Sequence, residues 1–270
     1  MFTTIISTQN LEKHLNDPNW VIVDCSYDLK EKEKGRERYL VSHIPGAVFV
    51  HVYRNLSGPP LTDKGRHPLP SPKALSDLFS KIGVSANTQV VAYDDSAGAY
   101  AARLWWSLNY MGHQKVAVLD GGFSAWVAEG RATSAGDEFN DPVDFQGSPQ
   151  KDRLVVLDEV LERPLLIDSR DSDRYFGLAK GSDPVAGHIP GAAHYHYVQS
   201  LTGEKKLKPS DELKTTFEEL LGDTPPEEVT FYCGSGISAC VSLLAMTHAG
   251  LPMGKLYVGS WSEWSREKEG

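Results

Sequence analysis

A cysteine followed by a glycine-rich turn is the segment of this sequence best suited to chemistry. Residues 232–240 read YCGSGISAC, so Cys233 follows an apolar run and is followed closely by Gly234 and Gly236. The apolar residues 237–248 then predict a helix. This pattern places Cys233 at the carboxyl end of a strand, among backbone N–H groups and at the positive end of a helix. Such surroundings stabilise a thiolate, and equally a persulfide anion, so we predict that Cys233 is a nucleophile near neutral pH.

The simplest alternative is a buried structural cysteine, because thiols are among the side chains most often found in protein cores. The glycine turn and the following helix favour a functional role for Cys233. Cys25 and Cys240 lack such surroundings. We interpret both as packing residues.

A cysteine phosphatase uses a similar loop, but it needs an arginine after five intervening residues to clamp the phosphate. Ala239 occupies that position here, and the loop contains no arginine or lysine. The sequence therefore disfavours a phosphatase. A non-catalytic module that only binds sulfur is a further alternative.

Composition narrows the class of protein. The chain has 270 residues, is 40% hydrophobic and carries a formal net charge of -9, which argues against a general nucleic-acid or anionic-membrane binder. Its three cysteines are too few for a disulfide framework, and no pair has zinc-ligand spacing. The N-terminal segment has the pattern of neither a secretory signal nor a membrane span. We expect a cytoplasmic protein without a metal.

The sequence contains one internal repeat, at a domain-sized offset of about 140 residues. Four segments recur in the same order: 21–24 with 165–168, 42–47 with 187–192, 89–94 with 228–233, and 119–126 with 257–264. The repeat predicts two homologous domains. Asp94 occupies the position that matches Cys233, and a carboxylate cannot carry a persulfide. Only the second domain is therefore expected to be catalytic.

Short apolar runs alternate with amphipathic stretches in each half, which predicts an α/β fold with a parallel sheet flanked by helices in each domain. Ser71 is the expected cap of one helix that stops at Gly83, and Ser210 of another that ends at Gly222. A polar stretch that carries several glycines and prolines predicts an interdomain linker. The predicted boundaries are 1–135 for the first domain, 136–152 for the linker and 153–270 for the second domain.

With these motifs, the chain resembles the tandem-domain rhodaneses over nearly its whole length. The segment 233–236 (CGSG) is similar to the loop of the 3-mercaptopyruvate sulfurtransferase branch. The thiosulfate-specific branch usually has basic residues after the cysteine, where this chain has Gly234 and Ser235. The resemblance implies a sulfurtransferase that uses 3-mercaptopyruvate, with thiosulfate as the alternative donor. It also implies a persulfide held by backbone N–H groups of the loop, contributed by Gly234, Gly236, Ile237, Ser238 and Ala239.

The resemblance assigns further residues. Arg174 matches the arginine that helps to bind the anionic donor, although a surface ion pair with Asp171 or Asp183 is the alternative. A second arginine of the branch is missing from segment 177–184, where only Lys180 could replace its charge.

Ser235 and His67 match two members of a Ser–His–Asp group that handles protons in the branch. The segment expected to hold the aspartate, 49–55, contains no acid, and Asp63 lies nearby in the sequence. His67 could instead be a solvated loop residue. His43 and His188 recur in both halves and are therefore expected to be structural, and the tryptophans are expected to lie in the core.

In the expected reaction, Cys233 takes sulfur from a small anionic donor and passes it to a thiol, cyanide or a thioredoxin-like acceptor. No metal or organic cofactor is needed for this chemistry. Neither a nucleic acid nor a membrane is an expected partner.

Overall fold

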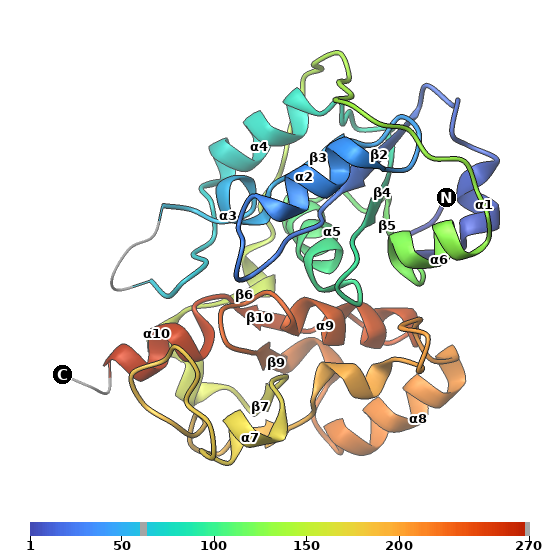
Figure 1. Ribbon diagram of the computed structural model, residues 1–270. Helices are drawn as coiled ribbons and strands as arrows, with labels where there is room; N and C mark the ends of the chain where they lie inside the picture. The colour runs from blue at the N-terminus through green and yellow to red at the C-terminus, as the bar shows by residue number, and fades with distance from the viewer. Residues whose placement is uncertain (60–63, 268–270) are drawn as a thin grey trace. The chain divides into compact units, whose positions relative to one another are not determined.

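The structure, a computed structural model, describes residues 1–59 and 64–267 and divides into two compact units (Figure 1). The first unit contains Met1–Leu56, Pro70–Gln150 and Gly203–Lys206. The second contains the described residues of Ser57–Leu69, Lys151–Thr202 and Leu207–Gly270. The described residues of segment 57–69 thus belong to the second unit although they lie in the first half of the chain.

Each unit is built on a five-stranded parallel sheet, and the two sheets have the same strand order. The order is β1-β5-β4-β2-β3 in the first unit and β6-β10-β9-β7-β8 in the second. The strands of the first sheet are β1 (Ile5–Ile6), β2 (Trp20–Asp24), β3 (Val48–Phe49), β4 (Gln89–Tyr93) and β5 (Val116–Leu119). Those of the second are β6 (Leu154–Val155), β7 (Leu165–Asp168), β8 (Ala193–His194), β9 (Val229–Tyr232) and β10 (Lys255–Tyr257). The repeated order confirms the predicted α/β duplication.

Helices flank both sheets (Figure 1). The first unit has α1 (Thr8–Glu12), α2 (Lys34–Val41), α3 (Val52–Asn55), α4 (Pro72–Lys81), α5 (Ala99–Tyr110) and α6 (Gly122–Ala128). The second has α7 (Ser172–Tyr175), α8 (Ser210–Leu221), α9 (Ala239–His248) and α10 (Ser260–Glu267). It also has four short 3₁₀ turns at Lys151–Arg153, Leu157–Glu162, Tyr197–Ser200 and Pro226–Glu228.

Most predicted helix boundaries are confirmed, with two differences. Ser71 caps α4 by accepting a hydrogen bond from the Ala74 N–H, as expected. Ser210 was expected to cap α8, but it is the first helical residue, and Pro209 precedes it without a side-chain cap. Helix α9 begins at Ala239, two residues later than predicted, because the chain first completes the turn around Cys233.

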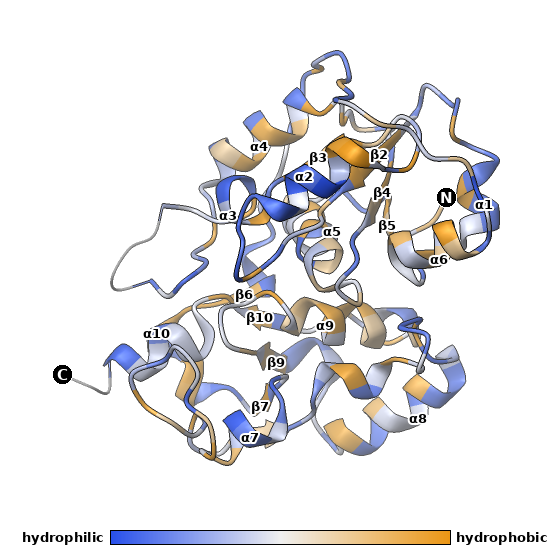
Figure 2. Ribbon diagram, viewed as in Figure 1, coloured by the Kyte–Doolittle hydropathy of each residue, from blue (hydrophilic) through white to orange (hydrophobic). Residues whose placement is uncertain are grey.

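The central helices and strands are covered by apolar side chains. Hydrophobic and polar residues alternate around α8, whereas α9 is apolar almost throughout, and nearly all of its residues are buried (Figure 2). Helix α9 packs on β9 and β10. The tryptophans that were predicted to lie in the core are buried in the two units: Trp105, Trp106, Trp126, Trp261 and Trp264.

The repeated His-Ile-Pro-Gly turns are structural in both units. The Nδ1 atom of His43 lies 2.7 Å from the Tyr39 carbonyl oxygen, and that of His188 lies 2.9 Å from the Tyr175 carbonyl oxygen. Each imidazole also stacks on the ring of the same tyrosine. Because the unit without a cysteine at the loop has the same contacts, they serve the fold.

Candidate active site

Cys233 lies at the carboxyl end of β9 and is 1% exposed. Its backbone is fixed by the start of α10. The Cys233 N–H donates to the Ser260 hydroxyl at 3.1 Å, and its carbonyl accepts from the Trp261 N–H at 3.0 Å. The end of β9 and the start of α10 together therefore hold the Cys233 backbone, and with it the sulfur, in place.

The loop surrounds the Cys233 thiol with hydrogen-bond donors. Burial by itself raises the pKa of this thiol, but hydrogen bonds from the Ser238 side chain and from loop N–H groups outweigh it, so the pKa is lowered. The N–H groups belong to Ser235, Ile237 and Ala239. The result is a buried sulfur that is stabilised as a thiolate.

A side chain would collide with the backbone at Gly236 and would lie close to two arginine side chains at Gly234. Gly236 has a φ of +72°, and a Cβ built there would lie 2.4 Å from the Val258 carbonyl oxygen. A Cβ on Gly234 would lie 3.1 Å from Nη2 of Arg66 and 3.5 Å from Nη1 of Arg174. Gly236 thus allows the turn, and Gly234 leaves room for two guanidinium groups.

Ser235 and His67 are 168 positions apart in the chain, and the structure brings them together. The Nδ1 atom of His67 lies 2.8 Å from the Ser235 hydroxyl oxygen. His67 belongs to segment 57–69, so this contact lies within the second unit. Asp63, the nearby acid in the sequence, lies outside the described residues.

Arg174 fits both interpretations of its role. Its Nε donates to Asp171 Oδ2 at 2.6 Å, which is the ion pair of the simpler alternative. Its Nη1 nevertheless lies beside Gly234, the residue after Cys233. Lys180, the possible replacement for a second arginine, is exposed.

Arg66 is a residue of the site that the sequence analysis missed. Its Nη1 pairs with the buried carboxylate of Asp183, and its Nη2 donates to the Gly234 carbonyl at 3.1 Å. Its backbone N–H donates to the Ser262 hydroxyl. The only signal in the sequence was its position directly before His67.

Ser260 was missed as well. It is one of the few residues other than glycine with positive φ, at +55°, and its hydroxyl bridges the Cys233 N–H and the Tyr257 carbonyl. The matching residue of the repeat is Gly122, with φ at +61°. A serine in this strained conformation is explained by the two hydrogen bonds that it makes at the cysteine.

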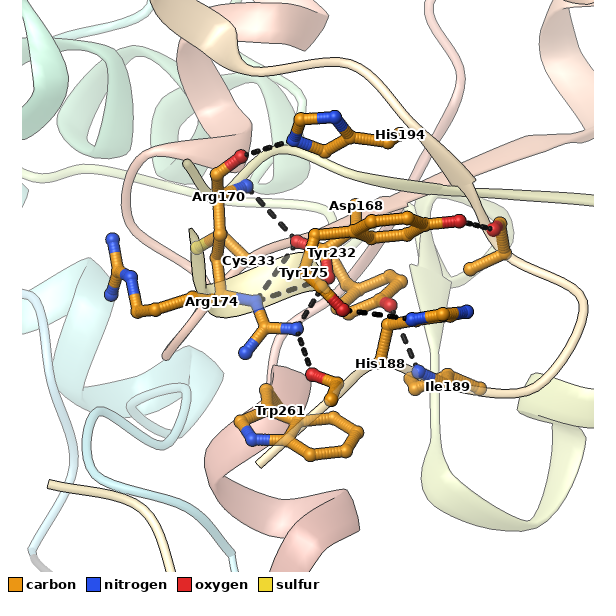
Figure 3. A network of polar contacts seen from close by, with 12 residues as sticks. Asp168, Arg170, Arg174, Tyr175, His188, Ile189, His194, Tyr232, Cys233 and Trp261 are labelled. Carbon is orange, nitrogen blue, oxygen red and sulfur yellow. Dashed lines mark hydrogen bonds and ion pairs between the residues drawn. The ribbon is translucent and has the colours of Figure 1, made fainter. Parts of the chain in front are cut away.

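A buried ion pair lies next to Cys233 (Figure 3). Nε and Nη2 of Arg170 both bond to Asp168, and Nη2 also donates to the Gly187 carbonyl at 2.7 Å. The guanidinium lies over the Trp261 ring, 4.8 Å from its centroid. Burial lowers the pKa of Arg170, but the contacts with Asp168 and the nearby Cys233 outweigh this and raise it. A permanent positive charge thus lies within electrostatic reach of the sulfur.

The matching loop of the first unit is filled by its own carboxylate. Asp94 is 1% exposed, and its two oxygens accept four backbone N–H groups at 2.6 to 3.0 Å. The donors belong to Ser96, Gly98, Tyr100 and Ala101. N–H donors like those that surround the Cys233 thiol in the second unit thus surround a carboxylate here.

The described residues contain no group of three or more histidine, cysteine or acidic side chains that could hold a metal ion. Across the same part of the chain, no helix is both long and apolar enough to cross a membrane.

The residues around Cys233 offer a stabilised thiolate, a serine–histidine pair and two guanidinium groups. This set suits nucleophilic attack by sulfur on an anionic molecule.

Comparison with known proteins gives a consistent family. The model of the rhodanese-like domain matches residues 7–129 and 154–267. A probable 3-mercaptopyruvate sulfurtransferase of Pseudomonas aeruginosa is 40% identical, over 96% of this chain and 94% of that protein. A thiosulfate sulfurtransferase of Rattus norvegicus is 30% identical, over 98% and 93%. The solved structure of a 3-mercaptopyruvate sulfurtransferase from Leishmania major matches with a TM-score of 0.88 at 30% identity, covering 99% of this chain and 75% of that one.

Proposed function

The chain belongs to the rhodanese-like domain family, and from that premise we propose that it is a sulfurtransferase that carries sulfur on Cys233. The observation that carries the proposal is the buried Cys233 thiol, whose pKa is lowered by donors from its own loop. Those same donors can hold the outer sulfur of a persulfide anion. Catalysis belongs to the second unit, because Asp94 fills the matching loop of the first.

The proposed donor is 3-mercaptopyruvate. The Cys233 thiolate attacks the thiol sulfur of the donor, a sulfur–sulfur bond forms and the carbon–sulfur bond breaks. The electron pair of the broken bond leaves on carbon as the enolate of pyruvate. The thiol proton of the donor then goes to that carbon, so the products are a persulfide anion and pyruvate, and no outside oxidant is needed.

Ser235 and His67 are suited to handle this proton. Their side chains are within hydrogen-bond distance, and Ser235 is two residues from Cys233. A histidine next to a hydroxyl can relay a proton between the donor thiol and the enolate carbon. Arg174 and Arg66 are placed to hold the carboxylate of the donor, because both guanidinium groups lie at Gly234.

Release of the sulfur regenerates the enzyme. Cyanide attacks the outer sulfur of the persulfide and leaves as thiocyanate, while the electrons of the sulfur–sulfur bond return to Cys233 as a thiolate. A small thiol or the thiol of a thioredoxin-like protein takes the sulfur in the same way.

The three cysteines, all in the described part of the chain, form no disulfide, and this supports a reducing, cytoplasmic compartment.

Thiosulfate is the second candidate donor, because relatives with that name are also similar over nearly the whole chain. In this reaction the thiolate takes the outer sulfur and sulfite leaves, with no proton to move. The loop favours 3-mercaptopyruvate, since Gly234 and Ser235 add no positive charge for a dianion.

Intact mass spectrometry after incubation with each donor tests the proposal. We expect a gain of one sulfur atom on the wild type, its removal by cyanide, and no gain on Cys233→Ser. The Cys240→Ser variant is the matched control and should load as the wild type does. Absence of a cyanide-sensitive sulfur at position 233 with both donors would overturn the proposed function.

A further inference from the structure

Two guanidinium groups lie next to Gly234, the residue that follows Cys233. Nη2 of Arg66 and Nη1 of Arg174 are both within 3.5 Å of the place where a Gly234 side chain would begin. Figure 3 shows the Arg174 guanidinium pointing away from the buried Asp168–Arg170 pair. We call Arg66 and Arg174 the arginine pair.

Each member of the arginine pair already has a carboxylate partner. Arg66 binds Asp183, whose side chain is 2% exposed, and Arg174 binds Asp171, whose side chain is 39% exposed. Burial raises the pKa of Asp171, but hydrogen bonds from Arg174 outweigh it and hold that pKa below its usual range. The two positive charges are thus balanced by two negative charges.

This balance affects donors of different charge in different ways. A guanidinium that is bound to one carboxylate still has N–H groups to offer, but its long-range field is largely cancelled. Binding of a donor with one negative charge depends more on hydrogen bonds from the guanidinium N–H groups than on their electrostatic field. Binding of a dianion next to the Cys233 thiolate brings three negative charges together, so it depends on a positive field to offset their repulsion.

We propose that Asp171 and Asp183 set the donor preference of this site, by neutralising the arginine pair so that a monoanionic carboxylate is accepted ahead of a dianion. The inference rests on the proposed sulfurtransferase function and names the residues that determine its specificity. The two aspartates do not touch the reacting atoms, and they act through Arg174 and Arg66.

The test is the ratio of kcat/KM for thiosulfate to kcat/KM for 3-mercaptopyruvate, at fixed ionic strength. Asp171→Asn keeps the shape of the side chain and removes its charge, and it should raise this ratio about five- to tenfold, the effect of one nearby unit charge at a partly exposed site. The change should come mainly from a lower KM for thiosulfate. Asp183→Asn should shift the ratio in the same direction.

Asp211→Asn is the matched control, because it removes the same charge from an exposed position at the start of α8. It should leave the ratio at the wild-type value. Asp183 is buried, so its variant is compared only if it keeps the wild-type circular dichroism spectrum, and Asp171→Asn decides the matter otherwise. An unchanged ratio in Asp171→Asn, with normal sulfur loading of Cys233, overturns the inference alone. Failure of the wild type to load sulfur from either donor overturns the proposed function instead.

Discussion

The loops that contain Asp94 and Cys233 have a similar backbone arrangement around two different acidic side chains, a carboxyl and a thiol. Both follow a central strand of a parallel sheet, and both direct main-chain N–H groups at a side chain that is 1% exposed. In the first unit burial prevails over four N–H contacts, so the pKa of Asp94 is raised. In the second the hydrogen bonds prevail, so the pKa of Cys233 is lowered. The same backbone geometry thus shifts the two pKa values in opposite directions, and the identity of the side chain decides whether chemistry follows.

The neighbouring strand ends sharpen the contrast. Asp24 and Asp168 match in the repeat, and each accepts the N–H of the residue two positions later, Ser26 or Arg170. Burial raises the pKa of Asp24 to about 6, with Ser26 beside it. Asp168 instead has the Arg170 guanidinium. The second unit thus has a buried cation near Cys233, where the first unit has a serine.

The largest effect is expected from exchanging the two anions. Cys233→Ser should lower sulfurtransferase activity by at least about 10³-fold, because a hydroxyl cannot form the persulfide. Asp94→Cys should place a new thiol among donors and give it reactivity toward iodoacetamide near pH 7, measured by peptide mapping. It should not restore turnover in Cys233→Ser, because the Ser235–His67 pair and the arginine pair belong to the second unit. Turnover by the double variant would show that the amide loop alone suffices.

Removal of the buried cation should mainly affect stability. Arg170→Met leaves the Asp168 carboxylate buried without its partner, so the free energy of unfolding should fall by about 3–5 kcal/mol. Urea denaturation followed by circular dichroism measures this change. Ser26→Ala, at the matching position of the first unit, removes a hydroxyl that bonds to Asp24 and should change it by only about 1 kcal/mol. Equal effects of the two variants would contradict the contrast between the strand ends.

The serine–histidine pair should separate the two donors. His67→Gln should lower kcat with 3-mercaptopyruvate by about 10²-fold or more, because only this reaction moves a proton from sulfur to carbon. With thiosulfate, kcat should stay within about threefold of the wild type, since no proton moves. Steady-state kinetics with both donors provide the measurement, and Ser235→Ala should behave similarly. A similar loss with both donors would assign His67 a purely structural role.

The smallest effect concerns the pH profile of sulfur loading. Cys233 is an acid whose folded pKa is lowered, so the reactive thiolate is present above that pKa and is lost as the pH falls through it. Ser238→Ala removes the side-chain donor to the sulfur, and the acid limb of kcat/KM should move up by about one pH unit. The profile is measured by the rate of persulfide formation. An unmoved limb would mean that backbone N–H groups alone hold the thiolate.

Local sequence predicted much of the fold because its causes are local. The apolar runs and their repeat fixed the strands and the duplication, and Ser71 and Pro72 marked the start of α4. Ser210 misled because Pro209 already occupies the cap position and sets the turn into α8. The start of α9 was predicted two residues too early. The apolar pattern of segment 237–248 indicates a helix, but it does not show that residues 237 and 238 still belong to the turn around Cys233.

By itself the sequence determined that Cys233 lies at a strand end before a glycine turn and that Asp94 holds the matching place. Those features depend on spacing along the chain, which the sequence displays directly. Only the tertiary structure decided that His67 meets Ser235, that Arg66 and Arg174 flank Gly234, and that Ser260 holds the Cys233 backbone. Most of these contacts join segments far apart in the chain, and the packing of side chains sets them, so no local pattern of residue types contains them.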